Sequence, residues 1–202
     1  MDWREKYEQA AARYRAGEGR AHDERQLVQL GNAAWAAGLC LLMLGDRPGS
    51  SVWLVRSAAR YRESWDAGAP TDAWGRPIAA MKALLIADNA CDKLSLAASW
   101  ALEAGATEAE SAIGRYAGTL ALLVLGRDDE AAAVAATLRE PFPQDVAAAL
   151  RALAAGDADA FAVAVADVRR SYEDRDGYLE DVPVPDTALA LEALDKGRRV
   201  GP

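Results

Sequence analysis

The chain has 202 residues, a hydrophobic content of 51% and a formal net charge of −8. Its length suits one domain with a substantial core, and its alanine-rich composition, with few clusters of Val, Ile, Thr and Phe, favours helix throughout. The negative charge disfavours nucleic acid and anionic membranes as partners and favours a basic protein or peptide.

The first residues and the cysteines indicate a cytoplasmic protein. Residues 1–6 lack the apolar core of a secretory signal, and the longest apolar run, residues 33–44, is shorter than the ~20 residues that span a bilayer. Cys40 and Cys91 both lie in apolar sequence, which predicts two buried, reduced thiols without a disulfide. The excess of arginine over lysine, together with the alanine content, is typical of a GC-rich bacterial or archaeal source.

Helical periodicity organises the first half of the chain. Apolar residues recur at three- and four-residue steps, and clusters of Gly and Pro separate the helical stretches. Ser50 or Ser51 is expected to cap the third helix, and Pro77 to lie in the first turn of the fourth. The four predicted helices cover about residues 2–16, 23–44, 51–65 and 77–87.

The most apolar stretch is residues 113–125, where only Arg115 and Thr119 are clearly polar. A helix of this composition needs neighbours on several sides, so it is expected at the centre of the fold. Gly126 is placed to end it in a left-handed conformation, and Asp128 to cap the next helix.

The remaining predicted helices flank this central one. The helix before it carries apolar residues on two faces, including Leu96 and Trp100, and is also expected inside. Residues 173–185 form an acidic connection that contains two prolines, and its last four residues must be extended. Further helices are predicted at about residues 144–155, 157–172 and 186–194.

One unit of the chain resembles a tetratricopeptide repeat, a helix–turn–helix unit of 34 residues. The Gly-Arg-Asp-Asp-Glu-Ala run at residues 126–131 matches the turn of that family, and Pro143 falls where the repeat ends. The resemblance covers about residues 107–143. It implies an all-α, single-domain stack of nine or ten helices in antiparallel hairpins, acting as a non-catalytic protein- or peptide-binding scaffold. Similar turn centres lie at Gly45, Asp88, Gly126 and Gly156.

Two groups of residues are candidates for contacting a partner. On the third predicted helix, Trp53 lies with Arg56 and Arg60 on the face opposite the apolar half, where Trp and Arg are typical anchors for a partner. Alternatively, residues 2–16 cover Trp53. In the next connection, Trp74 and Arg76 either stack on a ligand or close the end of the core.

The acidic connection has two interpretations. The segment at residues 178–185 either docks back on the helices and fixes the last one, or stays free as a linear recognition site for a basic partner. Docking predicts that its valines are buried.

Two other functions remain open. A bacterial immunity-type protein that neutralises a basic toxin fits the small size and acidity. An enzyme built on carboxylates would use Glu173, Asp174 and Asp181. No metal or cofactor is expected, because His22 is the only histidine and no phosphate-binding glycine loop is present.

Overall fold

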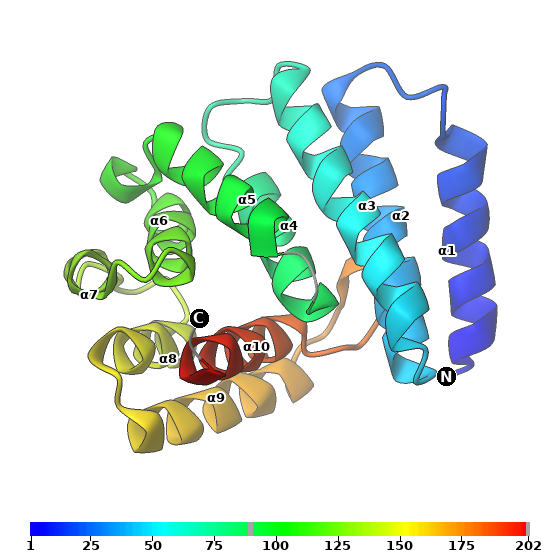
Figure 1. Ribbon diagram of the computed structural model, residues 1–202. Coiled ribbons are helices and arrows are strands. Elements are labelled where there is room, and N and C mark those ends of the chain that lie inside the picture. The colour runs from blue at the N-terminus through cyan, green and yellow to red at the C-terminus, as the bar shows by residue number, and fades with distance from the viewer. Residues whose placement is uncertain (89–90, 201–202) are drawn as a thin grey trace. The chain divides into compact units, whose positions relative to one another are not determined.

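The computed structural model describes residues 1–88 and 91–200 and is helical throughout (Figure 1). Within these residues the chain forms ten α-helices, two short 3-10 helices and no strand, which confirms the predicted all-α class. Contacts divide the chain into two compact units, residues 1–91 with 176–184 and residues 92–175 with 185–202. The prediction of one continuous stack stays a prediction.

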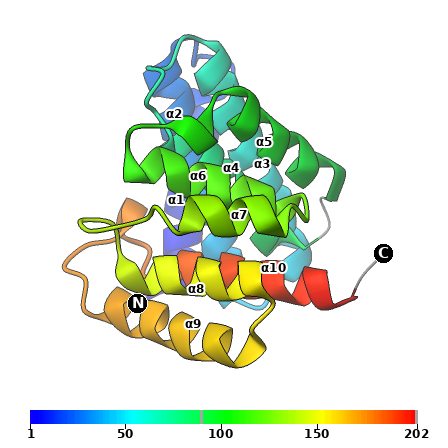
Figure 2. The ribbon, with the colours of Figure 1, turned by 90° about the vertical axis from the view of Figure 1, so that its left-hand side faces the viewer.

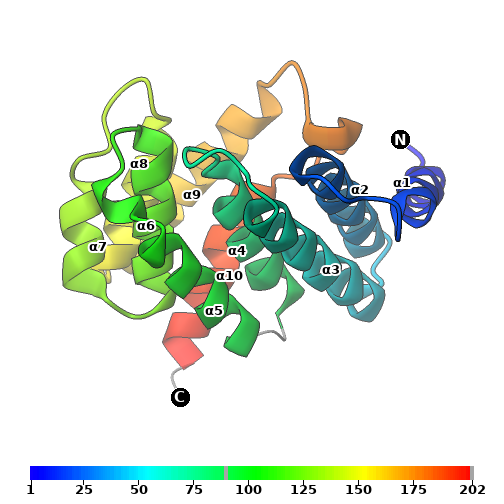
Figure 3. The ribbon, with the colours of Figure 1, turned by 90° about the horizontal axis from the view of Figure 1, so that it is seen from above.

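The first unit is a row of helices with a late segment of the chain added to it. Its elements are α1 (Trp3–Gly17), α2 (Glu24–Met43), α3 (Arg47–Asp66), α4 (Gly75–Ala87) and the short helix η2 (Leu179–Asp181). Each α-helix packs on the next along the chain, and η2 packs on α2. Figure 3 shows α1, α2 and α3 side by side, with η2 in orange next to α2.

Helix α2 is the core of the first unit. It is long and apolar enough to cross a membrane, but 67% of its most apolar 18-residue window is buried inside the protein, as in the core helix of a globular fold. Two glycines let α3 approach closely. A Cβ on Gly31 would lie 2.9 Å from the ring of Tyr61, and one on Gly38 would lie 2.7 Å from the side chain of Leu54.

The predicted division of α3 into an apolar core half and a polar outer face is wrong, because Trp53 of the polar face is buried while the apolar Val52 is 52% exposed. The buried stripe includes serines because their hydroxyls donate to carbonyl oxygens of α2: Ser57 Oγ to Gly31 O at 2.9 Å and Ser64 Oγ to Glu24 O at 2.6 Å. The buried residues of α3 are Ser50, Trp53, Leu54, Ser57, Ala58, Tyr61 and Ser64.

The second unit contains most of the remaining helices. They are α5 (Cys91–Glu103, apart from Cys91), η1 (Ala106–Glu108), α6 (Ala112–Val124), α7 (Asp128–Ala135), α8 (Gln144–Ala155), α9 (Ala158–Glu173) and α10 (Asp186–Val200). Contacts link α6 with η1 and α7, α7 with α8, α8 with α9, and α10 with α8 and α9. Figure 2 shows α7, α8 and α9 as successive rows.

Helix α6 is the predicted central helix, and its burial confirms that prediction. Every residue from Tyr116 to Leu123 is buried. Gly118 allows η1 to pack against it, because a Cβ there would lie 2.9 Å from backbone atoms of Ala106 and Thr107. Only the start of the helix faces solvent, at Ile113.

The four predicted turn centres all have left-handed backbones. Their φ angles are 81° at Gly45, 59° at Asp88, 69° at Gly126 and 66° at Gly156. The aspartate after glycine caps the next helix at Asp46 and Asp157, so α3 begins before the predicted caps Ser50 and Ser51. The predicted cap at Asp128 is wrong, because its carboxylate pairs instead with Arg198 at 2.6 Å.

Two predictions around α5 are also wrong. Cys40 is buried as expected, but Cys91 is exposed. Leu96 is 70% exposed, because α5 presents a single buried stripe that includes Trp100 and leaves the other apolar face to solvent.

Candidate functional site

Trp53 of α3 is buried against α1, as the second of its two predicted roles requires. It is 7% exposed, and its indole meets the rings of Tyr14 and Tyr7 edge to face at centroid distances of 5.2 and 6.3 Å. Arg56 lies over the indole at 4.9 Å and is itself exposed. The predicted groove at Trp53 is therefore filled by the first helix.

Arg60 lies at the edge of the same contact between α1 and α3. Its Nε donates to Tyr14 Oη at 3.1 Å, and its guanidinium pairs with Glu63 at 2.6 Å and with Glu18 at 3.4 Å. Burial opposes the charged form of Arg60, but the bonds to Glu63 and Tyr14 hold its pKa above the usual value. Arg60 therefore joins α1 to α3.

Trp74 and Arg76 close one end of the first unit. Trp74 is buried and packs on Trp65 at a centroid distance of 6.0 Å. Arg76 Nε donates to Ser64 Oγ at 2.8 Å, and its guanidinium pairs with Glu24. Of the two predicted roles, stacking on a ligand or closing the end of the core, Trp74 and Arg76 therefore have the second.

The carboxylates of the enzyme alternative lie on the surface. Glu173, Asp174 and Asp181 are all exposed. Across residues 1–88 and 91–200, no group of three or more His, Cys, Asp or Glu side chains is arranged to hold a metal ion. His22 is exposed, and its backbone N–H donates to Gln26 Oε1 at 2.9 Å.

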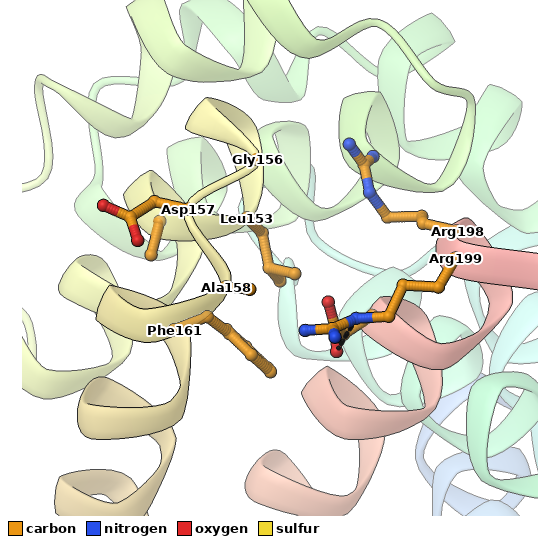
Figure 4. Close-up of a pocket in the computed structure, with 9 residues that line it drawn as sticks. Leu153, Gly156, Asp157, Ala158, Phe161, Arg198 and Arg199 are labelled. Carbon is orange, nitrogen blue, oxygen red and sulfur yellow. Dashed lines mark ion pairs between the residues drawn. The ribbon is translucent and has the colours of Figure 1, made fainter.

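One cavity, of about 340 Å³, opens in the second unit (Figure 4). Arg198 and Arg199 project toward it from α10, and Asp157 stands at the start of α9. Arg198 pairs with Asp128, Arg199 pairs with Asp195 at 2.8 Å, and Asp157 caps α9. Because each of these charged groups already forms an ion pair or caps a helix, their positions at this cavity have a structural explanation.

A recess in the first unit lies along α1 and α2. Two open cavities of about 640 and 420 Å³ share Arg13 and Glu180, and we call them together the α1–α2 groove. The α1 wall is formed by Lys6, Gln9, Arg13, Ala16 and Gly17 of α1 and by Arg20 in the turn that follows it. The α2 wall is formed by Gln26, Gln29, Leu30, Ala33 and Ala36.

Three basic residues lie along the α1 wall. Lys6 and Arg13 are seven residues apart on α1, so they lie on one side of the helix about 10.5 Å apart along its axis, and Arg20 follows in the turn after the helix ends. Arg13 Nη1 pairs with Glu180 Oε2 at 2.5 Å. In the part of the chain that the structure describes, neither Lys6 nor Arg20 forms an ion pair, so two of the three charges are available to a ligand.

Side-chain amides and small residues complete the groove. Gln9, Gln26 and Gln29 are exposed along its walls, and amides can both donate to and accept from a peptide backbone. Ala33 and Ala36 are buried and have short side chains, so little protrudes from the α2 wall. An extended chain can therefore lie close to the helix surface.

The sequence contains only part of this site. The seven-residue spacing is visible in residues 6–20, but Arg4 and Arg15 interrupt it, and the net charge directs attention to basic partners. Glu180, which completes the groove, comes 160 residues after Arg20, and no local pattern predicts that it pairs with Arg13.

No protein-family model, curated protein or solved structure matches this chain. The resemblance of residues 107–143 to a tetratricopeptide repeat therefore stays a prediction.

Proposed function

We propose that the protein is a non-catalytic scaffold that holds an extended acidic segment of a partner protein in the α1–α2 groove. The observation that carries this proposal is that three basic residues, Lys6, Arg13 and Arg20, line one wall of the groove. The net charge of the whole chain favours a basic partner, but the charge of this wall favours an acidic one.

The spacing of the charges favours a polyproline II conformation for the ligand. That helix has three residues per turn and a rise of about 3.1 Å, so every third side chain returns to the same side after about 9.3 Å. This distance is close to the ~10.5 Å between Lys6 and Arg13 on α1. Acidic residues three positions apart would therefore face Lys6 and Arg13, and the next one would continue toward Arg20, which lines the same cavity as Arg13.

The backbone of such a ligand also fits the amides of the groove. A polyproline II chain has no internal hydrogen bonds, so its carbonyl oxygens are free to accept from side chains such as Gln9, Gln26 and Gln29. From Lys6 to Gly17, the last residue of α1, the wall is about 16.5 Å long, which is the length of about five residues in this conformation.

The chain itself places an acidic segment against the wall. Glu180 pairs with Arg13, and it is followed by Val182-Pro183-Val184-Pro185, a sequence that favours an extended chain. This intramolecular contact supports the class of ligand proposed.

A labelled peptide tests the proposal. Fluorescein-labelled Glu-Pro-Pro-Glu-Pro-Pro-Glu is titrated with the protein at low salt, and binding is followed by fluorescence anisotropy. The matched peptide, Glu-Glu-Glu-Pro-Pro-Pro-Pro, has the same composition and charge but the wrong spacing. Because an exposed ion pair contributes about 0.2–1 kcal/mol, loss of two pairs should weaken binding by about tenfold.

Variants of α1 give the second arm of the test. Lys6→Gln combined with Arg20→Gln should weaken binding of the spaced peptide by about tenfold. The control, Arg4→Gln combined with Arg15→Gln, removes the same charge from the opposite side of α1 and should leave binding within about twofold. Equal affinity for the two peptides, or an equal loss in both variants, would refute the proposal.

A further inference from the structure

A short segment of the chain crosses the α1–α2 groove as a strap. The strap is residues 178–184, part of the 176–184 segment that belongs to the first unit although residues 92–175 and 185–202 belong to the second. Val182 and Val184 are buried and anchor its later half. This burial confirms the alternative in which the acidic connection docks on the helices.

Glu180 divides the groove into its two cavities. It lines both of them together with Arg13, the middle basic residue of the α1 wall. The Glu180 side chain is 16% exposed and that of Arg13 is 56% exposed, so the ion pair can be reached from solvent on the arginine side. A ligand that spans all three basic residues therefore meets Glu180 at Arg13.

The strap holds Glu180 in an unfavourable backbone conformation. Glu180 and Asp181 are consecutive residues with φ of 58° and 54°, and in this left-handed region a Cβ crowds the backbone. The Asp181 N–H bonds to Tyr178 O at 3.0 Å and the Val182 N–H to Leu179 O at 3.2 Å, which closes the turn. Release of Glu180 relieves this strain, while the buried valines keep the strap attached.

We infer that the strap is an internal pseudo-ligand, in which Glu180 occupies the central position of the groove until an acidic residue of the partner displaces it. This inference rests on the proposed function and adds its regulation. The groove is therefore autoinhibited. The ion pair between Arg13 and the central acidic residue of a ligand contributes less binding free energy than it would in an empty groove, because it must replace the pair with Glu180. The outer positions at Lys6 and Arg20 remain open for first contact.

Glu180→Gln tests the inference because glutamine keeps the shape of the side chain and removes its charge. The affinity for Glu-Pro-Pro-Glu-Pro-Pro-Glu should rise by about threefold to tenfold, since Arg13 becomes available. The affinity for Glu-Pro-Pro-Gln-Pro-Pro-Glu, which has no central carboxylate, should change by less than about twofold. Glu173→Gln, the control, removes the same charge from an exposed site before the strap and should change neither affinity.

Hydrogen exchange on the wild-type protein gives an independent measurement. Binding of the spaced peptide should speed exchange at the amides of Asp181 and Val182, because the turn opens as Glu180 leaves Arg13. A ligand that binds without displacing the strap would slow exchange or leave it unchanged. Circular dichroism of each variant checks that the helical fold is intact.

The outcomes separate the two proposals. If the spaced peptide binds the wild type but Glu180→Gln raises its affinity no more than Glu173→Gln does, the groove binds peptides and the strap does not compete. Slowed or unchanged exchange at the strap overturns the inference in the same way. If neither peptide binds any variant, the proposed function fails and this inference fails with it.

Discussion

Replacement of Trp53 by alanine should destabilise the protein strongly. Truncation of a buried aromatic residue costs about 3–5 kcal/mol. Trp53 is 7% exposed and pairs edge to face with both Tyr14 and Tyr7, and each such pair adds about 0.5–1.5 kcal/mol beyond burial. We therefore expect a loss of about 4–5 kcal/mol in the free energy of unfolding. In a chain of 202 residues this corresponds to a fall in Tm of roughly 10 °C or more.

Urea unfolding followed by far-UV circular dichroism measures this loss. Trp53→Phe keeps an aromatic ring in the contact and should lose only about 1–2 kcal/mol. Arg56→Ala removes the exposed cation–π contact alone and should lose less than about 1 kcal/mol. If Trp53→Ala loses less than about 1 kcal/mol with an unchanged urea dependence, Trp53 does not belong to the core and the assignment of α1 as its cover is wrong.

Two further predictions concern α6 and the cysteines. Gly118→Ala should lower the thermal midpoint of unfolding, because the clash of the new Cβ with the backbone at Ala106 costs more than the gain of about 1 kcal/mol in helix preference. The control Gly75→Ala has open space around it and should keep or raise the midpoint. Cys91 should react with a disulfide reagent at pH 8 in the folded protein, and Cys40 only after unfolding, because burial raises the pKa of its thiol to about 11. Because the pKa of Cys40 in the folded protein lies above its ordinary value of 9.0, the thiol contributes its full share to the free energy of unfolding below pH 9, and this contribution declines as the pH rises toward 11. The Cys40→Ala variant should not show this decline. Equal labelling of both thiols in the folded protein, or a Gly118→Ala variant as stable as the wild type, would contradict these expectations.

The helices and their ends could be predicted because local chemistry decides them. A left-handed residue ends a helix wherever the chain must reverse, and glycine adopts that conformation without a steric penalty, so Gly45, Gly126 and Gly156 are visible in the sequence. The all-apolar run that became α6 likewise required surrounding helices, whichever helices these are.

The face of α3 could not be predicted from hydrophobicity. Ser57 and Ser64 count as polar in any periodic pattern, yet both are buried because α2 presents a carbonyl oxygen to each hydroxyl. That pairing depends on the register of two helices and on Gly31, which lets them approach. The alternative in which Trp53 lines an open groove with Arg56 and Arg60 is therefore wrong, and the alternative in which residues 2–16 cover Trp53 is confirmed.

The groove depended on contacts between distant parts of the chain. Gln26 and Gln29 lie close to Arg20 in sequence, but the strap comes more than 150 residues later. Single-sequence periodicity describes each helix alone and does not bring Glu180 to Arg13. For that reason the sequence directed the prediction to a basic partner, whereas the assembled wall favours an acidic one.

The late return of residues 176–184 to the first unit has a consequence for synthesis of the protein. Translation proceeds at about 5–20 residues per second, so the ribosome needs roughly 4 to 17 seconds to go from residue 91 to residue 176. During this interval α1 to α4 have been synthesised but residues 176–184 have not, so Arg13 lacks Glu180. A nascent chain stalled in this interval should already bind acidic peptides, and should bind them more tightly than the finished protein does.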